Sequence, residues 1–299
     1  YREVCRILEA ESYDIVYLNI STAIDCIAAW AAKKKKVPRI FIHSHTSGND
    51  CENPVKRMIF DSIHKFCRLS LYRAATEYYG CSEKAGLWMF PEKIVKSDRF
   101  QMIFNAVDLK KFTYSSAVRD DVRKELNLEN KFVVGHVGNF VYQKNHYFLI
   151  DIFEELKRKC PEAVLLLLGR GERFETVEKR IKEKGLEDSV RLLGFRKDPD
   201  RLFQAMDFFL LPSYFEGLPT VGVEAQCTGL PSLMSDTITT EVKITENCWF
   251  LPLKEKPEVW ADFVLKHRET DREHISWIGK KEAYSLETLK KQQQRLLEK

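Results

Sequence analysis

Two glutamates frame the start of a predicted helix in the run PSYFEGLPTVGVE. Glu216 precedes Pro219, and Glu224 lies eight residues beyond Glu216. Because proline suits the first turn of a helix, the N–H groups of Thr220 and Val221 lack an intrahelical acceptor and can bind a phosphate. An ionised carboxylate accepts paired hydrogen bonds, which suits the hydroxyl groups of a sugar. The run therefore predicts a site for a phosphorylated sugar, although glutamates at this spacing also arise by chance in charged chains.

A second loop with suitable chemistry is the run GHVGNFVYQKNH at residues 135–146. Gly138 lets a ligand approach the main chain, and Lys144 offers a point charge to a phosphate. The same residues also fit a flexible loop with a solvated lysine. We therefore treat this loop as a phosphate site only in combination with the first one.

Two more runs place polar groups after apolar segments. The run GRGE begins at Gly169 and contains Arg170, but a simple tight turn also explains it. The run RIFIHSHT contains His43 and His45. These histidines are either structural or directed at a ligand.

Short apolar runs alternate with amphipathic stretches, which is the pattern of strands that are each followed by a helix. Expected strands are residues 14–19, 39–43, 76–80, 100–104, 132–138, 163–168, 190–194, 207–211, 231–234 and 249–253. Expected helices are residues 1–10, 21–33, 54–75, 82–89, 146–159, 172–184, 199–206, 219–228 and 284–298. This order predicts an α/β fold with doubly wound parallel sheets, whose ligands bind beyond the carboxyl ends of the strands. The polar loops described above all lie at such ends.

The composition excludes several classes of protein. The chain has 299 residues, of which 44% are hydrophobic and 31% charged, so we expect about two globular domains. The net charge of 48 − 44 = +4 is too small for a basic nucleic-acid binder. No apolar run reaches the roughly 18 residues that a transmembrane helix needs. The eight cysteines form no CxxC pair, so we expect buried thiols in a cytoplasmic protein rather than a zinc site or disulfides.

The polar segment 105–130 separates two regions of alternating strands and helices. We expect a first domain at residues 1–112, a second at 113–283 and a final helix at 284–299 that crosses back to the first domain. The first region starts with a helix pattern and no strand before it. We therefore expect the first domain to be incomplete at its start.

The motifs together resemble the GT-B glycosyltransferases of family GT4, in particular the bacterial capsular and exopolysaccharide enzymes of the EpsF and CapM kind. The resemblance covers most of the chain. It is carried by the runs RIFIHSHTSG, GCSEKAGLWMF, NAVD, GHVGNFVYQKNH, LLLLGRGE, LLGFRKD and LPSYFEGLPTVGVEAQCTGLP. It implies two Rossmann-like domains that face a cleft, with the acceptor on the side of the first domain and the nucleotide sugar on the second.

The resemblance also implies roles for matching residues. Glu216 would contact the donor sugar near the reacting carbon, and Glu224 would hold the nucleotide ribose. Lys144 would contact the diphosphate, and His45 matches the histidine that the first domain contributes, with His43 as the alternative. The other implied donor-site residues are Gly138, Asn139, Arg170, Arg196, Gly217, Leu218, Thr220 and Val221.

The implied activity is the retaining, metal-independent transfer of a sugar from a nucleotide-sugar donor to a saccharide or lipid-linked saccharide. No cofactor and no nucleic acid are expected. Asn139 stands where the family commonly has arginine, so the site offers one positive charge fewer to the diphosphate. A nucleotide-sugar-binding protein with impaired catalysis therefore stays open, as does an epimerase or phosphorylase on the same fold.

Three further features each allow two interpretations. The triplet Asp198-Pro199-Asp200 has the D-x-D pattern of a metal motif, but Asp198 and Pro199 fit the start of a helix better, so we predict no metal. The lysines at 33–36 either complement a helix dipole or dock on anionic lipid as a peripheral membrane contact. The stripe in segment 54–75 is expected to pack on its own sheet, or else to line the acceptor cleft. This stripe consists of Ile59, Ile63, Phe66 and Leu69.

Overall fold

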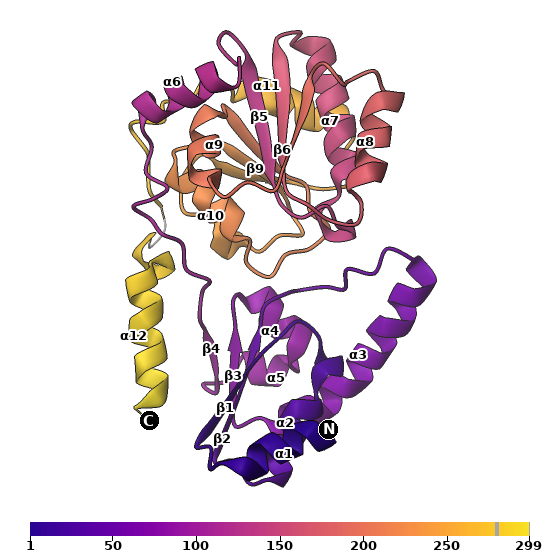
Figure 1. The fold of residues 1–299 in the computed structure, drawn as a ribbon, viewed down its shortest axis with the longest axis vertical. Helices are drawn as coiled ribbons and strands as arrows, with labels where there is room; N and C mark the ends of the chain where they lie inside the picture. Colours follow the sequence, from indigo (N-terminus) through magenta and orange to yellow (C-terminus); the bar gives the residue numbers. More distant parts are fainter. Residues whose placement is uncertain (279–280, 299) are drawn as a thin grey trace. The chain divides into compact units, whose positions relative to one another are not determined.

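The computed structural model describes residues 1–278 and 281–298, and its contacts divide the chain into two compact units (Figure 1). The first unit comprises Tyr1–Asn105, Phe215–Leu218 and the C-terminal segment from Gln292, and the second comprises Ala106–Tyr214 and Pro219–Lys291. The division after Asn105 lies earlier than the boundary at 112–113 expected from the sequence. The short segment Phe215–Leu218 was expected within the second domain but groups with the first unit.

A four-stranded parallel sheet forms the centre of the first unit. Its strands lie in the order β1 (Ile15–Ile20), β2 (Arg39–Ser44), β3 (Glu77–Gly80) and β4 (Phe100–Met102). Each strand pairs with the next one along the chain, and the register places Asn19 opposite His43. All four strands were expected from the alternation of apolar runs.

The helices of the first unit are short except for one. They are α1 (Arg2–Ala10), the 3-10 turn η1 (Ala23–Asp25), α2 (Ile27–Lys34), α3 (Pro54–Ala74), α4 (Glu83–Met89) and α5 (Glu92–Val95). The single helix expected at 21–33 is thus a turn followed by a helix. The core between sheet and helices includes Ile40, Ile42, Leu71, Tyr78 and Phe90.

Helix α3 begins where the sequence predicts, but the face that it buries is not the expected one. The Asn53 side chain accepts hydrogen bonds from the N–H groups of Val55 and Lys56, and Pro54 takes the first helical position. The expected packing of the apolar stripe on the sheet is wrong. The stripe residues Ile59, Ile63, Phe66 and Leu69 are 50%, 42%, 76% and 61% exposed. The buried residues of α3 are His64, Leu71 and Ala74.

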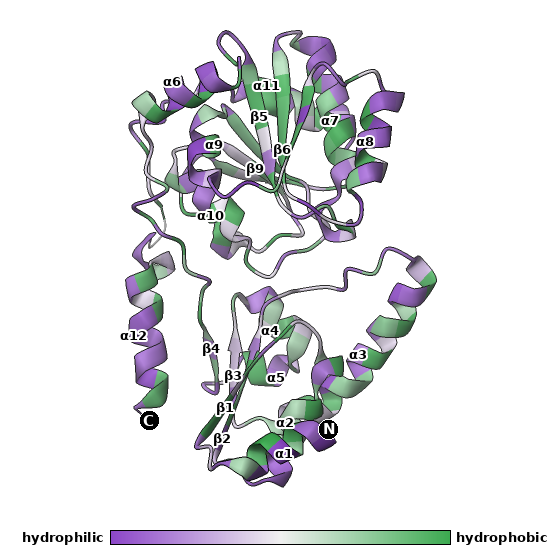
Figure 2. Cartoon of the chain, viewed as in Figure 1, coloured by the Kyte–Doolittle hydropathy of each residue, from purple (hydrophilic) through white to green (hydrophobic). Residues whose placement is uncertain are grey.

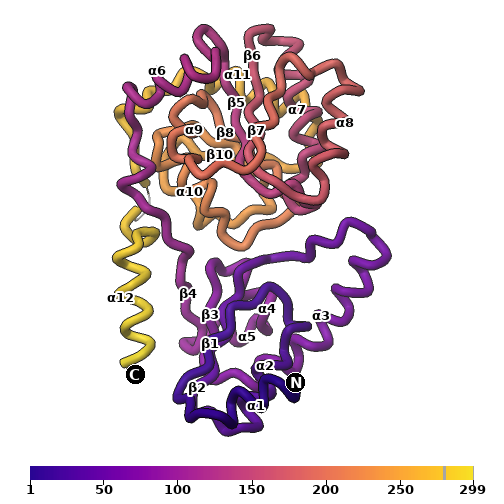
Figure 3. Tube along the Cα trace, in the orientation of Figure 1, coloured from indigo at the N-terminus to yellow at the C-terminus, as the bar shows by residue number. Residues whose placement is uncertain are grey.

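The second unit contains a six-stranded parallel sheet, whose chain path Figure 3 traces. The strands are β5 (Phe132–Val137), β6 (Ala163–Leu168), β7 (Val190–Gly194), β8 (Phe208–Leu211), β9 (Ser232–Ser235) and β10 (Cys248–Leu251). Their order in the sheet is β10-β9-β8-β5-β6-β7. The chain therefore builds outward from β5 in one direction and then returns to the other side of β5, as in a doubly wound Rossmann sheet.

Helices separate the strands of the second unit as expected, and two more were not foreseen. They are α6 (Ser116–Glu125), α7 (His146–Lys159), α8 (Phe174–Glu183), α9 (Pro199–Ala205), α10 (Thr220–Cys227) and α11 (Pro257–Lys266), with 3-10 turns η2 (Tyr142–Lys144), η3 (Thr240–Val242) and η4 (Lys281–Tyr284). Helix α12 (Leu286–Leu297) begins in the second unit and ends in the first. The additional helices are α6, in the segment read as mixed and polar, and α11. The core includes Val134, Phe153, Leu165, Val177 and Trp260, which are buried together. Among the described helices, none is both long enough and apolar enough to cross a membrane.

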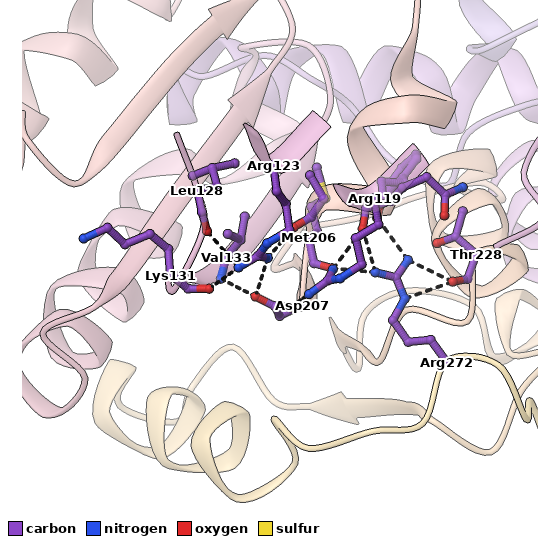
Figure 4. Close-up of polar contacts among 12 residues, drawn as sticks. Arg119, Arg123, Leu128, Lys131, Val133, Met206, Asp207, Thr228 and Arg272 are labelled. Carbon is purple, nitrogen blue, oxygen red and sulfur yellow. Dashed lines mark hydrogen bonds and ion pairs between the residues drawn. The ribbon is translucent and has the colours of Figure 1, made fainter. Parts of the chain in front are cut away.

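A partly buried carboxylate fixes α6 to the start of the second sheet (Figure 4). Asp207 forms ion pairs with Arg119 and, at 3.1 Å, with Arg123. Its Oδ2 also accepts a hydrogen bond of 2.7 Å from the N–H of Val133, the second residue of β5. Because the carboxylate has both cationic and main-chain donors, its charge is compensated inside the fold.

Arg272 caps the carboxyl ends of two helices in the same region (Figure 4). Its side chain is 8% exposed, and burial lowers its pKa to about 9, so it stays charged at neutral pH. The guanidinium donates hydrogen bonds of 2.6–3.1 Å to the carbonyls of Phe203, Gln204 and Met206 at the end of α9 and of Thr228 at the end of α10. These carbonyls have no partner within their own helices.

Candidate functional site

The reversal of strand order in the second unit marks one edge of the sheet as a ligand site. Strand β5 lies between β6 and β8, and the chain switches direction there. In doubly wound sheets, ligands bind outside the carboxyl ends of the strands at this switch point. The residues that follow β5 and β8 are linked by a hydrogen bond of 2.8 Å from the N–H of Tyr214 to the carbonyl of Gln143. The two strongest sequence motifs therefore begin side by side.

Three glycine-containing loops form the edge beyond β5, β6 and β7. The N–H of Gly169 donates to the carbonyl of Gly194 at 2.9 Å, and the N–H of Phe140 donates to the carbonyl of Arg170 at 2.9 Å. Gly169 has φ of +146°, and a Cβ there would lie 1.9 Å from the carbonyl oxygen of Gly138. Only glycine can occupy that position. The GRG run is thus more than an ordinary turn, because it allows two loops to pack main chain against main chain.

Gly138 and Lys144 lie together, as their shared loop suggested. The 3-10 turn η2 and Asn145, which has a left-handed backbone with φ of 53°, fold the loop back on itself. A Cβ at Gly138 would lie 2.9 Å from Cε of Lys144. The aliphatic part of the lysine therefore rests on the glycine. Asn139 is exposed between them and contributes no charge.

Two buried histidines lie behind this loop, and the sequence analysis missed them. Nδ1 of His136 donates to the carbonyl of Leu210 at 2.8 Å, whereas Nε2 of His136 and both ring nitrogens of His146 have no partner among the described residues. Burial, with a contribution from Lys144, lowers the pKa of His136 to about 3 and that of His146 to about 2. Both rings are therefore neutral. Their only signal in the sequence is that they flank the Gly138–Lys144 segment.

The amino end of α10 provides unpaired main-chain N–H groups at the end of β8. Pro219 is the residue before the first helical residue rather than within the first turn. The N–H groups of Thr220 and Val221 come first in the helix and have no intrahelical acceptor. Together with the helix dipole they favour an anion at this point.

Glu224 lies in the same helix, where burial raises its pKa to about 7. The nearby carboxylate of Asp200 contributes to the rise, and Lys111 opposes it. Lys111 and Asp200 form an ion pair at 3.1 Å. Lys111 was not singled out from the sequence, and Asp200 was considered there only as part of a possible metal motif. A carboxyl group with this pKa changes charge near neutral pH and is held ready to accept or share a proton.

Arg170 and Arg196 both lie at strand ends, and Arg196 forms ion pairs with Glu125 and Asp198. Arg170 lies over the ring of Phe195 at 5.0 Å, and Phe195 is 60% exposed. Arg196 binds the two oxygens of Asp198 at 2.8 Å each. The expected helix cap by the Asp198 side chain is therefore wrong, although Pro199 does begin α9.

The histidines of the first unit form an ordered pair at the end of β2. The hydroxyl of Tyr17 lies 2.7 Å from Nδ1 of His43, and Nε2 of His45 lies 2.7 Å from Oδ1 of Asn19. The two imidazole rings are 4.1 Å apart. Since an amide oxygen only accepts, Nε2 of His45 carries the proton. Burial lowers the pKa of both rings, that of His43 to about 3, and His45 is the more exposed of the two.

Glu216 is buried in the first unit, with 5% of its surface exposed. The hydroxyl of Ser47 donates a hydrogen bond of 2.6 Å to the main-chain carbonyl of Glu216. The ring of the preceding residue, Phe215, covers Gly48, where a Cβ would lie 2.5 Å from the ring. Through these contacts, the segment Phe215–Leu218 belongs to the first unit.

Gly217 and Leu218 continue this segment past His45. A Cβ at Gly217 would lie 2.2 Å from the main-chain oxygen of His45, so only glycine allows the approach. The hydroxyl of Ser82 donates to the carbonyl of Gly217 at 2.6 Å, and the Asn105 amide donates to the carbonyl of Leu218 at 3.3 Å. The structure therefore brings the EGL run together with His45, which sequence distance alone did not indicate.

No metal centre is recognisable in the described part of the chain. Residues 1–278 and 281–298 contain no group of three or more histidine, cysteine, aspartate or glutamate side chains that could hold an ion. The Asp198 and Asp200 carboxylates of the DPD run face Arg196 and Lys111 respectively. Their environment is that of ion pairs rather than of a ligand set.

Comparison with known proteins shows that the second unit is similar to a family of glycosyltransferases. Residues 118–256 match the family described as Glycosyl transferases group 1. The EpsF protein of Bacillus subtilis (strain 168) is 29% identical over 268 residues, which are 84% of this chain and 67% of EpsF. The UDP-Gal:alpha-D-GlcNAc-diphosphoundecaprenol alpha-1,3-galactosyltransferase of Escherichia coli is 28% identical over 235 residues, or 77% of this chain and 60% of that enzyme.

A solved structure matches the fold of nearly the whole chain. Anabaena HepE in complex with UDP-glucose superposes with a TM-score of 0.76 at 20% identity, covering 99% of this chain and 81% of that chain. The chain thus spans about two thirds or less of the curated relatives named above. Its residues 118–256 are similar to the glycosyl transferases group 1 family, and its two parallel α/β units have the GT-B fold.

Proposed function

We propose that the protein transfers a sugar from a nucleotide-sugar donor to a hydroxyl group of a saccharide acceptor. The observation that carries the proposal is that the family match at 118–256 includes the switch point of the second sheet, with Gly138, Lys144 and the amino end of α10. The related Escherichia coli enzyme is named for transfer from UDP-Gal to a diphosphoundecaprenol-linked sugar. A bacterial surface polysaccharide is therefore the proposed product, and a lipid-linked saccharide is the proposed acceptor.

The donor would bind with its diphosphate between the amino end of α10 and Lys144. Main-chain N–H groups and a lysine stabilise an anion without a metal ion. The ionised carboxylate of Glu224 would accept hydrogen bonds from the hydroxyl groups of the ribose. Phe195 and Arg170 offer a flat apolar and cationic surface next to this edge, which suits a nucleotide base.

The difficult step in such a transfer is departure of the nucleotide diphosphate, on which negative charge grows. One preorganised donor at a developing charge is worth roughly 3–4 kcal/mol. Asn139 supplies no charge, so Lys144 and the α10 N–H groups would carry this stabilisation. We propose retention at the anomeric carbon, with Glu216 and His45 at the sugar.

Two isosteric variants test the proposal. Glu224→Gln should weaken binding of the nucleoside diphosphate about tenfold, because it removes a charged acceptor. Glu216→Gln should mainly lower turnover and leave nucleotide affinity within a few-fold of the original. Titration calorimetry with UDP, GDP and ADP measures binding, and release of nucleotide from the donor in the presence of acceptor measures turnover. Glu187→Gln, an exposed loop residue, is the matched control.

The alternatives give different results in the same assays. Conversion of the donor without any acceptor would identify an epimerase, and a requirement for inorganic phosphate would identify a phosphorylase. Nucleotide binding with no turnover on any donor and acceptor pair would favour a binding protein, in line with Asn139. Full activity of both glutamate variants would refute the site itself.

A further inference from the structure

The imidazole of His136 is a polar group in an otherwise apolar part of the second sheet. Figure 2 shows hydrophobic residues along β6 and much of β5, the strand that carries His136. The side chain is fully buried. Its Nδ1 lies 2.8 Å from the carbonyl of Leu210, whereas Nε2 has no partner among the described residues. Because an unpaired buried polar atom destabilises a fold, a histidine at this position indicates a role for Nε2.

The side chain of Lys144 runs past this unpaired nitrogen. Side chains two residues apart in a strand point to the same side, so the missing side chain of Gly138 leaves a slot beside the His136 ring. The point where a Gly138 Cβ would lie is 2.9 Å from Cε of Lys144 and 3.3 Å from Nε2 of His136. Nε2 and Cε are therefore at most 2.9 + 3.3 = 6.2 Å apart. The lysine occupies the slot, and Nε2 is the atom of His136 that borders it.

The carbonyl of Leu210 determines which nitrogen of His136 carries the proton. Because a carbonyl only accepts, Nδ1 bears the hydrogen, and the neutral ring leaves Nε2 as an acceptor. Burial lowers the pKa of His136 to about 3, and the charge of Lys144 contributes to the shift. The ring is therefore neutral at physiological pH and does not repel the lysine. An ammonium group has three N–H donors, so it can bind Nε2 and phosphate oxygens together.

Aromatic rings hold the His136 imidazole in this orientation. The ring of Phe209 is parallel to it with centroids 6.4 Å apart, and the ring of His146 meets it edge to face at 4.9 Å. Phe140 in turn stacks on His146 at 4.3 Å. His146 is the first residue of α7 and follows Lys144 by two positions. The same packing therefore fixes both the imidazole and the end of the loop that carries the lysine.

We propose that His136 is a positioning residue that directs the Lys144 ammonium toward the diphosphate of the bound nucleotide. Nε2 accepts one hydrogen bond from the ammonium, whose other N–H groups bind phosphate oxygens. Lys144 is the one charged residue between Gly138 and Asn145, so its direction decides where this loop presents positive charge. The inference rests on the proposed function, which brings a diphosphate to Lys144. It assigns to His136 a share in the selection of nucleoside diphosphates over monophosphates.

Titration calorimetry with UDP, GDP and ADP and with the matching monophosphates tests the inference. His136→Asn keeps an amide nitrogen as many bonds from the main chain as Nδ1, but it has no atom at the place of Nε2. It should lower the affinity for the diphosphate about tenfold and leave that for the monophosphate nearly unchanged. His136→Gln reaches as far as Nε2 with an amide oxygen and should restore part of the preference.

The matched control is Val134→Ala. Val134 is a fully buried residue on the same side of β5 as His136. Its truncation loosens the same strand without touching Nε2, so the preference for the diphosphate should stay unchanged. Thermal melting verifies that all variants fold.

A double-mutant cycle with Lys144 separates positioning from a purely structural role. Lys144→Met should remove most of the preference for the diphosphate, and His136→Asn should lower it no further in that background. Effects that simply add would overturn the inference, because the histidine would then act independently of the lysine. Equal losses of affinity for the diphosphate and the monophosphate in His136→Asn would overturn it as well.

The same measurements distinguish failure of this inference from failure of the proposed function. If the unaltered protein binds none of the three diphosphates, both are overturned. If it binds one of them with a preference that Lys144→Met removes and His136→Asn leaves intact, only the role of His136 is overturned. Binding that does not depend on Lys144 would likewise refute that role and leave the transferase proposal standing.

Discussion

Helices α3 and α7 occupy equivalent places in the two units, since each connects one parallel strand to its neighbour. They differ in the face that they bury: α7 buries its row of large apolar side chains, whereas α3 leaves most of its own exposed. Helix α7 buries Leu149, Ile150, Ile152, Phe153 and Leu156. Helix α3 buries His64, Leu71 and Ala74, and it leaves most of its other large apolar side chains, including Ile59 and Phe66, exposed to solvent. An amphipathic pattern therefore predicts that a helix exists, but not which of its faces is covered.

The buried histidines of the two helices differ in the same sense. His64 of α3 has a partner for each ring nitrogen, so it acts as a specific polar connection to η1 and α4. His146 of α7 has none among the described residues and lies among aromatic rings, 4.3 Å from Phe140. In α7, apolar packing fixes the helix, whereas in α3 hydrogen bonds do.

The largest expected difference between the helices concerns truncation of a phenylalanine. Phe153→Ala should lower the free energy of unfolding by about 3–5 kcal/mol, because the ring is fully buried and leaves a cavity. Phe66→Ala should change it by less than about 0.5 kcal/mol, because the ring is 76% exposed. Urea unfolding of both variants measures the two values. Similar losses would mean that the outer face of α3 is covered in the folded protein.

A smaller change in folding stability is expected from the titration of Glu224 as the pH rises. Burial raises the pKa of Glu224 from 4.5 to about 7, so the folded protein holds a proton that the unfolded chain releases near pH 4.5. Folding stability from this group is complete below pH 4.5 and is lost as the pH rises to 7. Relative to Glu224→Gln, the original protein should lose about 1–3 kcal/mol over this window. Parallel pH profiles of the two proteins would contradict the raised pKa.

The smallest change in folding stability is expected from the protonation of His64 as the pH falls. Burial lowers the pKa of His64 below 6.5, so the unfolded chain takes up a proton first. The stability that depends on the neutral ring is present above pH 6.5 and is lost as the pH falls. In His64→Gln, whose amide can replace both hydrogen bonds, the loss as the pH falls below 6.5 should be smaller. Thermal melting at several pH values measures it, and an unchanged profile would show that the ring is not held neutral.

Most strands and helices could be predicted from the sequence, because buried parallel strands are short apolar runs with glycine or proline at their ends. Helix α7 has the predicted bounds, and the strands differ by one or two residues at most ends. Helix α6 was missed because only Val122 of it is buried, so it has almost no apolar periodicity. Its position depends on Arg119 and Arg123 reaching Asp207, a contact between residues far apart in the chain.

Only part of the candidate site could be predicted from the sequence. Gly138, Lys144 and the amino end of α10 could be located because the residues that make up each of these features lie close together in the chain. The hydrogen bond between His45 and Asn19, the environment of Glu224 and the association of the EGL run with the first unit could not. Each depends on which strands become neighbours, and local sequence carries no record of that.

The capping of two helices by Arg272 has a practical consequence for expressing the second unit alone. A fragment trimmed to the family match at 118–256 would retain α9 and α10 but lose the guanidinium that binds their four terminal carbonyls. The carbonyls of Gln204 and Met206 would keep Arg119 as a donor, whereas those of Phe203 and Thr228 would lose the guanidinium. A recombinant fragment intended for crystallisation or NMR should therefore extend through residue 272, well past the end of the conserved match.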